Sequence, residues 1–430
     1  MTDALVDTWL RNRELAEKLL RLTADARPEQ IPRDADAIVT HIEVNHRHGV
    51  GVLVHRLFGQ SENVLSIRSK DAYNGNQQFG TTHVCISHGA ASRDMVFWNV
   101  LEALRGATVN RVLCIPYFPD DALTAIALAN IFAAPLCTYL MDDQNLCADG
   151  IPDSVIAELL ATSSLRLAIS PELCAGYEER YGQKMWFMPP LVPGSSIPTR
   201  LNQASKTMLQ SKSGVIVGNI WGQRWSELLR QTVRHSGTTL RWYNNGEFPW
   251  IACSKEELAR DGVIPQEGVR HTDEKLIEIL RDAPFVVVPS GTLDETDDRY
   301  FIAKLSLPSR IPFTFATSHA PLLVLGSPET AAARFVAEMG IGLVAPYERR
   351  AFQEAVDRIT DPDQNSAMRR AAFRLSDRFT DQGAAEWIWR SLANGEPVDR
   401  RYEELMPRPE PAHSISRESP RAQAMATWCS

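Results

Sequence analysis

Short apolar runs alternate along this chain with segments of helical pattern, and this alternation limits the fold more than any other feature. Such runs are typical of strands that are buried on both faces of a parallel sheet, with helices covering the sheet. In the first half of the chain we predict strands over residues 37–42, 64–67, 83–87, 112–117, 136–141 and 167–170, and helices over 52–58, 94–105, 122–132 and 152–162.

A proline-rich segment at residues 189–196 interrupts this pattern and is typical of a linker. Beyond it the alternation resumes, with strands predicted over 215–220, 240–243, 285–289, 322–325 and 343–345. The 430 residues are enough for two domains. We therefore predict an α/β protein with two tandem Rossmann-like domains and a cleft between them. The predicted parts are an N-terminal helix (1–30), a first domain (31–190), a linker (191–212), a second domain (213–382), a C-terminal helix (383–406) and a tail (407–430).

Composition excludes several other classes of protein. Charged residues make up 23% and hydrophobic residues 44%, as in ordinary globular proteins. The net charge of -8 argues against a nucleic-acid partner. The seven cysteines are odd in number and none has C-x-x-C spacing, so we expect neither a metal site nor a disulfide framework. Free thiols and the absence of a signal-peptide pattern at residues 1–9 favour the cytoplasm.

Two segments raise the question of membrane contact. Residues 3–25 have apolar side chains near helical spacing, together with basic residues. We favour packing of this helix on the first domain; the alternative is contact with a membrane surface or with a partner protein. Residues 123–141 are free of charge, but Pro135 interrupts them, so we interpret them as a buried helix and a strand.

Candidate site residues of the first domain stand in the loops that follow predicted strands, where parallel sheets bind ligands. Gly49 and Gly51 would let backbone amides approach an anion at a helix start; a plain tight turn is the alternative. His88 is a candidate general base or a buried structural histidine. Asp142 and Asp143 would bind an acceptor hydroxyl, act as base or hold a metal; the alternative is a helix cap.

The second domain offers a matching set of loops. Arg224 stands at a predicted helix start, where a guanidinium neutralises a diphosphate well, although the neighbouring tryptophans could be core. Ser290, Asp294 and Glu295 follow the strand predicted at 285–289. Ser309 and Arg310 precede an apolar helix and suit a diphosphate or a ribose.

The order of several segments resembles the GT-B glycosyltransferases that use nucleotide sugars, in particular the retaining, metal-independent enzymes of the family-4 type. The resemblance covers roughly residues 37–395 and rests on segments 169–182, 217–219, 268–271, 283–290, 306–310 and 315–324. It implies a nucleoside-diphosphate sugar as donor, a carbohydrate, lipid-linked or other hydroxyl acceptor, and no cofactor. It also implies that Arg270 and His271 contact the base of the donor, and that polysaccharide or glycoconjugate synthesis is the setting.

The chain departs from that family in four respects. The later of the family's two glutamates would fall near Phe313, His319 replaces a glycine, and Asp142-Asp143 replaces a His-Asp pair. The family's Arg/Lys pair for the diphosphate is represented only by Arg224, with Lys304 or Arg310 as possible substitutes. We expect a glycosyltransferase with the donor on the second domain and the acceptor on the first. The alternatives are a catalytically silent binding subunit and a nucleotide-sugar epimerase or phosphorylase of the same fold.

Overall fold

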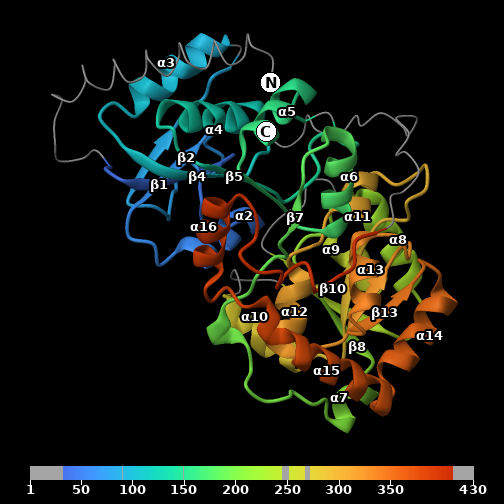
Figure 1. The fold of residues 1–430 in the computed structure, drawn as a ribbon. Coiled ribbons are helices and arrows are strands. Elements are labelled where there is room, and N and C mark those ends of the chain that lie inside the picture. The colour runs from blue at the N-terminus through green and yellow to red at the C-terminus, as the bar shows by residue number, and fades with distance from the viewer. Residues whose placement is uncertain (1–31, 90, 149, 245–250, 267–271, 410–430) are drawn as a thin grey trace.

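The structure is a computed structural model that describes residues 32–409 apart from 90, 149, 245–250 and 267–271 (Figure 1). Arg270, His271, the segment 3–25 and the tail from 410 onward therefore lie outside the described residues. The fold predicted from the alternating pattern is confirmed: two parallel sheets, each flanked by helices, follow one another along the chain.

The first sheet has seven strands among the described residues, in the order β3-β2-β1-β4-β5-β6-β7, and every pair is parallel. The strands are β1 (Ala35–Thr40), β2 (Val64–Arg68), β3 (Thr82–Cys85), β4 (Val109–Cys114), β5 (Leu136–Leu140), β6 (Leu165–Ala168) and β7 (Trp186–Phe187). Its helices are α2 (Gly49–Phe58), α3 (Arg93–Ala103), α4 (Pro119–Ile131), α5 (Asp153–Thr162) and α6 (Pro171–Tyr181).

The second sheet has six described strands, in the order β10-β9-β8-β11-β12-β13. They are β8 (Ser213–Val217), β9 (Thr239–Tyr243), β10 (Val263–Pro265), β11 (Val286–Pro289), β12 (Leu322–Leu325) and β13 (Gly342–Ala345). The longer helices around it are α8 (Gln223–Val233), α10 (Asp273–Arg281), α12 (Arg310–Ser318), α13 (Ala331–Glu338), α14 (Arg349–Ile359) and α15 (Pro362–Ser376), with shorter ones at α7 (Lys206–Gln210), α9 (Lys255–Arg260) and α11 (Tyr300–Leu305).

Each sheet reverses its strand order at one point, between β1 and β4 in the first and between β8 and β11 in the second. At such a point, neighbouring strands send their connections to opposite faces of the sheet, and the loops at their carboxyl ends diverge. The candidate residues near β1, β5, β8 and β11 lie at the carboxyl edges of the two sheets. The topology therefore identifies these edges as the places where a ligand would bind.

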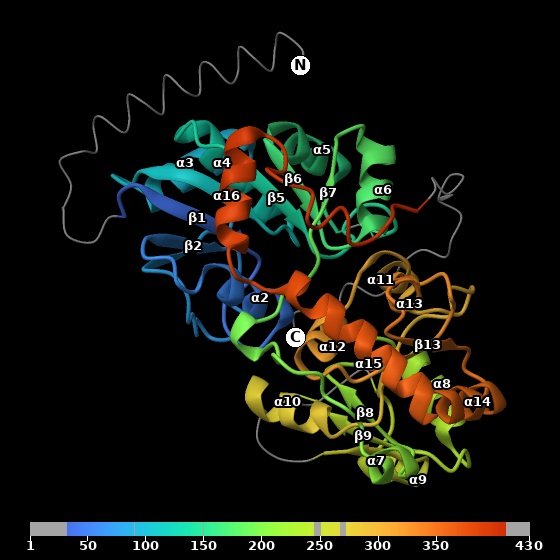
Figure 2. The ribbon, with the colours of Figure 1, turned by 60° about the horizontal axis from the view of Figure 1, so that its bottom comes forward.

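The chain crosses between the domains twice. Val192 pairs with Thr380 in a parallel bridge, so that the outgoing and returning segments lie side by side. The returning segment leads to α16 (Ala384–Asn394), which packs on the first domain next to α2 (Figure 2). There the Arg111 guanidinium lies over the Trp389 ring, 4.4 Å from the ring centroid. The same ring packs against Phe58. The last helix therefore belongs to the first domain.

Two local differences from the sequence prediction affect the site. The helix predicted at 52–58 begins earlier, at Gly49, so that both loop glycines lie in its first turn. In addition, α6 was missed as a helix, although Ser170 caps it and Pro171 begins it. No helix in the described part of the chain is long and apolar enough to cross a membrane.

Candidate active site

Arg310 supplies a cation at the start of α12. Its Nη1 donates to the Val217 carbonyl at the end of β8, 3.1 Å away. Burial lowers the pKa of Arg310 to about 10, which leaves it protonated at neutral pH. No acidic side chain pairs with Arg310 among the residues that the structure describes. A desolvated cation without a counter-ion is unfavourable, so this position favours an anionic ligand.

Gly218 makes room beside this cation. It takes a left-handed conformation with φ of +77°, and a Cβ atom at this position would lie 4.0 Å from the Arg310 guanidinium. Its carbonyl accepts from Trp242 Nε1 at 2.8 Å. The loop that follows β8 is therefore fixed in shape where it passes the guanidinium.

The start of α2 faces the start of α12 across the domain boundary. A Cβ atom at Gly49 would lie 3.9 Å from the Oγ of Ser309, the N-cap residue of α12. His48 caps α2: its Nδ1 accepts from the Gly51 amide at 3.3 Å, and its Nε2 donates to the Glu43 carbonyl at 2.8 Å. Helix N-termini carry partial positive charge. Two of them meet here, one from each domain, close to Arg310.

Asp142 lies at the same boundary. Its carboxylate accepts from the Tyr117 hydroxyl at 2.5 Å, and Ser306 from the second domain lies beside it. Burial raises the pKa of Asp142, while the hydroxyls of Tyr117 and Ser306 oppose the shift. Asp142 is therefore a partly buried carboxyl with increased basicity at the edge of the first sheet, the condition that suits a general base.

Asp143, although adjacent in sequence, is used by its own loop. Its two carboxylate oxygens accept from the backbone amides of residues 145, 146, 147 and 148, at 2.8–3.1 Å. The Tyr177 hydroxyl on α6 also donates to it, at 3.3 Å. With this many donors, the carboxylate shapes the loop after β5 and so positions Asp142.

His88 is held between α3 and α4. Its Nε2 lies 2.8 Å from the Thr124 hydroxyl, its Nδ1 lies 3.3 Å from the Asn99 amide, and its backbone N–H donates to Asp120. Burial lowers its pKa. None of these contacts is shared with Asp142, so the structure does not bring the two predicted catalytic residues together. The buried structural alternative explains His88 as it stands.

The backbone amides at the start of α8, where Arg224 lies, already bind a carboxylate of the chain itself. Asp298 accepts from the backbone amides of Gln223, at 2.8 Å, and Arg224, at 3.4 Å. The Arg224 side chain lies near Glu227 and, through its charge, helps to lower the pKa of Asp294, whose main partner is Thr296. A diphosphate at the start of α8 would have to displace Asp298, so Arg310 is the better placed of the two cations.

The remaining residues predicted for the second domain lie in the loop after β11. Ser290 is buried, and its carbonyl accepts from the Tyr347 hydroxyl at 2.8 Å. Asp294 and Glu295 are exposed. Asp297 in the same loop accepts from Trp225 Nε1 at 2.8 Å and thereby ties the loop to α8. The loop is anchored at both ends and presents its acidic tip to solvent.

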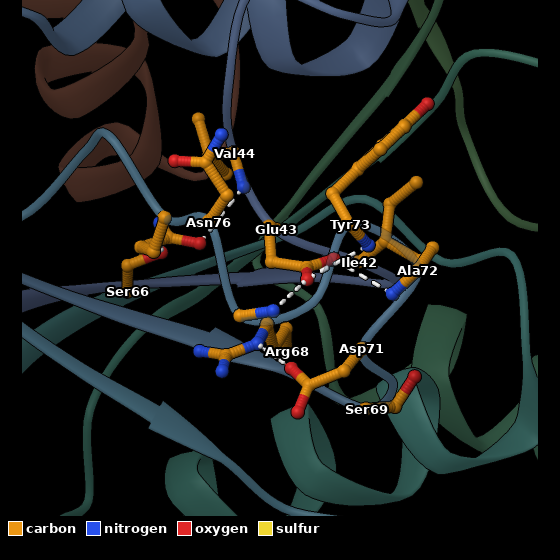
Figure 3. A network of polar contacts seen from close by, with 12 residues as sticks. Ile42, Glu43, Val44, Ser66, Arg68, Ser69, Asp71, Ala72, Tyr73 and Asn76 are labelled. Atoms are coloured by element: carbon orange, nitrogen blue, oxygen red, sulfur yellow. Dashed lines mark hydrogen bonds and ion pairs between the residues drawn. The ribbon is translucent and has the colours of Figure 1, made fainter.

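Sequence reasoning missed Glu43, which organises the first domain's part of the site (Figure 3). Its carboxylate accepts from the amides of Ala72, Tyr73 and Gly75 at 2.7–2.9 Å, while the Tyr73 ring points away from it. Burial acts to raise the pKa of Glu43, but these amides together lower it. A lone acidic residue just after a strand was the only signal in the sequence.

No protein-family model and no curated protein sequence matches this chain. Its similarity to solved structures is clear. The Anabaena protein Alr3699/HepE, crystallised with UDP and glucose, aligns over 84% of this chain and 99% of its own, with a TM-score of 0.59 at 13% identity. Sucrose-phosphate synthase from Thermosynechococcus elongatus aligns over 85% and 100%, with a TM-score of 0.56 at 13% identity.

A glycosyltransferase from Rickettsia africae aligns over 84% of this chain and 98% of its own, with a TM-score of 0.59 at 10% identity. These alignments include both sheets in their order along the chain. The chain has the GT-B fold. Identity this low establishes the fold alone, so the chemistry of this GT-B protein has to be argued from its own residues.

Proposed function

We propose that this GT-B protein is a glycosyltransferase that moves a sugar from a nucleoside-diphosphate sugar to an acceptor hydroxyl, in the cytoplasm and without a metal or cofactor. One observation carries the proposal. The mostly buried Arg310 has no acidic partner among the described residues, and it lies where the helix starts at Gly49 and Ser309 meet. An arginine and two helix N-termini are the groups that stabilise a leaving diphosphate.

Asp142 supports the same reaction from the acceptor side. Asp142 lies next to Ser306, and Ser306 is only a few residues from Arg310 along the chain. The raised pKa of Asp142 suits it to take a proton from a hydroxyl group. The Tyr117 hydroxyl, which donates to Asp142, would orient the carboxylate. In this arrangement Asp142 touches the acceptor, Asp143 positions it, and His88 has a structural role.

Binding is tested by thermal unfolding with UDP, GDP, ADP, CDP and TDP, each with and without Mg²⁺. A diphosphate at one hundred times its Kd adds about 2.7 kcal/mol of stability. We expect one base to give this gain, and we expect Arg310→Met to weaken binding at least about tenfold, as for a lost hydrogen bond to a charged group. Arg234→Met, which alters a cation on the second domain that is paired with Asp261, is the matched control.

Turnover is tested by release of the diphosphate from its sugars in the presence of a panel of acceptors. We expect Asp142→Asn to lower kcat about 10²–10⁴-fold. Diphosphate binding without release for any acceptor would favour the silent subunit, whereas release of the diphosphate without acceptor would favour an epimerase. No stabilisation by any diphosphate would contradict the proposed function.

A further inference from the structure

A group of aromatic and cationic side chains lies at the carboxyl ends of β1, β2 and β4, where the first sheet reverses its strand order. We call it the cationic face, and it consists of His41, Arg47, His48, Lys70, Tyr73, Tyr117 and Phe118. Its members are linked by ring contacts: His41 lies 4.3 Å from Tyr117, 5.7 Å from His48 and 6.0 Å from Phe118, between ring centroids.

The two cations of this face are held on aromatic rings and have no acidic partner in the described ranges. The Lys70 ammonium lies 3.6 Å from the Phe118 ring centroid, and the Arg47 guanidinium lies 4.9 Å from that of Tyr73. Both side chains are exposed. Arg68, close to Lys70 in sequence, is paired with Asp71 at 2.6 Å. Because Arg68 is paired, Lys70 and Arg47 are the cations of this face that are available to a ligand.

Two carboxylates near this face, those of Glu43 and Asp121, are buried, and the half-exposed Asp71 is paired with Arg68. Glu43 accepts hydrogen bonds from three backbone amides of the loop 72–75. Asp121 accepts hydrogen bonds from the amides of Tyr117 and Phe118 at 2.8–2.9 Å. Both oxygens of Glu43 and the Oδ2 of Asp121 are occupied by the backbone, and neither carboxylate forms an ion pair with Lys70 in the described part of the chain. The Lys70 ammonium therefore remains on the surface of the face without an acidic partner.

His41 provides an independent sign of a ligand. Its side chain is 9% exposed, and its Nδ1 atom is buried with no hydrogen-bond partner. Lys70 lies close enough to influence its titration. Because buried polar atoms are nearly always hydrogen-bonded, an unsatisfied nitrogen on the ring that packs against Tyr117 points to a partner that the chain does not supply.

The face leads directly to the proposed reaction site. The Tyr117 ring lies against His41, and its hydroxyl donates to Asp142. An acceptor whose hydroxyl group reaches Asp142 would therefore extend along Tyr117 toward Lys70. Lysine presents a compact charge with three donors, which suits the oxygens of a phosphate group.

We infer that the acceptor is phosphorylated and that Lys70 binds its phosphate group, with Arg47 adding to the positive field. The inference rests on the proposed function, since it names the acceptor class of that site. The phosphate group could belong to a soluble sugar phosphate or to a phospholipid, and the two share the same chemistry at Lys70.

The test separates this face from the donor site. The full chain, saturated with the stabilising nucleoside diphosphate, is titrated with glycerol phosphate and followed by thermal unfolding. We expect further stabilisation, with an affinity about tenfold lower in Lys70→Met and less reduced in Arg47→Met. Lys184→Met is the matched control, since Lys184 also lies over a ring, that of Trp186, but is ion-paired with Glu178.

Three results would overturn the inference while leaving the proposed function intact: diphosphate binding with no response to glycerol phosphate, a response that Lys70→Met leaves unchanged, or an equal loss in Lys184→Met. Absence of diphosphate binding would instead count against the proposed function. Arg310→Met should weaken the diphosphate response and retain that to glycerol phosphate.

Flotation with phosphatidylglycerol vesicles, compared with phosphatidylcholine vesicles, distinguishes the two sources of the phosphate group. Lys70-dependent flotation identifies a phospholipid, and its absence identifies a soluble sugar phosphate.

Discussion

Arg56 on α2 of the first domain donates to Asp273 on α10 of the second, with 2.9 Å between Nη2 and Oδ2. The same guanidinium donates to the Leu191 carbonyl in the linker at 3.2 Å and lies over the Phe313 ring at 5.3 Å. Phe313 stands near where the resembled family has a glutamate. In this protein the side chain at that position of α12 packs against Arg56 of the first domain.

Arg56→Met should therefore destabilise the protein by about 2–3 kcal/mol, since it removes two hydrogen bonds from a side chain that is 11% exposed. Asp273→Asn should have an effect below about 1 kcal/mol, because the Asp273 side chain is 43% exposed and solvent replaces the partner. Urea unfolding of the two variants measures the difference. Equal losses would contradict this assignment of the interface.

The neighbouring aspartates should behave in opposite ways. Asp143→Asn leaves the amides of Cys147 and Ala148 facing an NH₂ group and should lower the free energy of unfolding by about 2–4 kcal/mol. Asp142→Asn can still accept from Tyr117, so its effect on stability should stay below about 1 kcal/mol while turnover falls. Urea unfolding and diphosphate release, measured on both variants, test the pair. A larger stability loss in Asp142→Asn would refute the division of roles.

The two glycines of α2 differ in the space around them. A Cβ atom at Gly51 would lie 2.1 Å from the Asn45 carbonyl oxygen, whereas one at Gly49 meets nothing closer than Ser309 Oγ. Gly51→Ala should cost about 3 kcal/mol through displacement of the loop backbone, and Gly49→Ala should change stability by less than about 1 kcal/mol. The urea midpoints of the two variants test this difference in stability. Similar midpoints would show that the loop backbone at Asn45 shifts at little cost in free energy.

His41 should make the protein sensitive to acid. Burial is the main reason that the pKa of His41 is lowered to about 3, from 6.5 in the unfolded chain. A lowered histidine pKa means that the unfolded state binds the proton first, so this stability is present above pH 6.5 and is lost as the pH falls. Between pH 7 and pH 5 the loss should be about 2 kcal/mol.

His41→Phe keeps a ring against Tyr117 and removes the titrating group, so its stability should fall by about 2 kcal/mol less over this range. Unfolding of both proteins in urea at pH 7 and pH 5 gives the comparison, in which the contributions of other titrating groups cancel. Parallel losses in the two proteins would mean that His41 is protonated in the folded state.

Local patterns in the sequence predicted most of the strands, though not the short β7 and β10, because a buried strand is mostly apolar, as in residues 136–141. They also placed Gly49, Ser309 and Arg310 at helix starts, where the structure has them, since helix starts have recognisable residues. They could not show that Asp298 occupies the start of α8, or that Asp142 accepts from Tyr117, because these partners are 74 and 25 residues apart. The different roles of Asp142 and Asp143 depend on which donors each meets, the distant Tyr117 hydroxyl for Asp142 and the amides of its own loop for Asp143.

The return of α16 to the first domain has a consequence for how the protein is made. Trp389 completes the packing around Phe58, and Glu403 accepts from the Phe187 amide at 2.5 Å. The first domain to be synthesised therefore lacks part of its core until the segment that follows the second domain has left the ribosome. While the second domain is being synthesised, the apolar surface around Phe58 would therefore stay exposed to solvent. A fragment that ends after the second domain would retain every strand of the first sheet and still expose this surface.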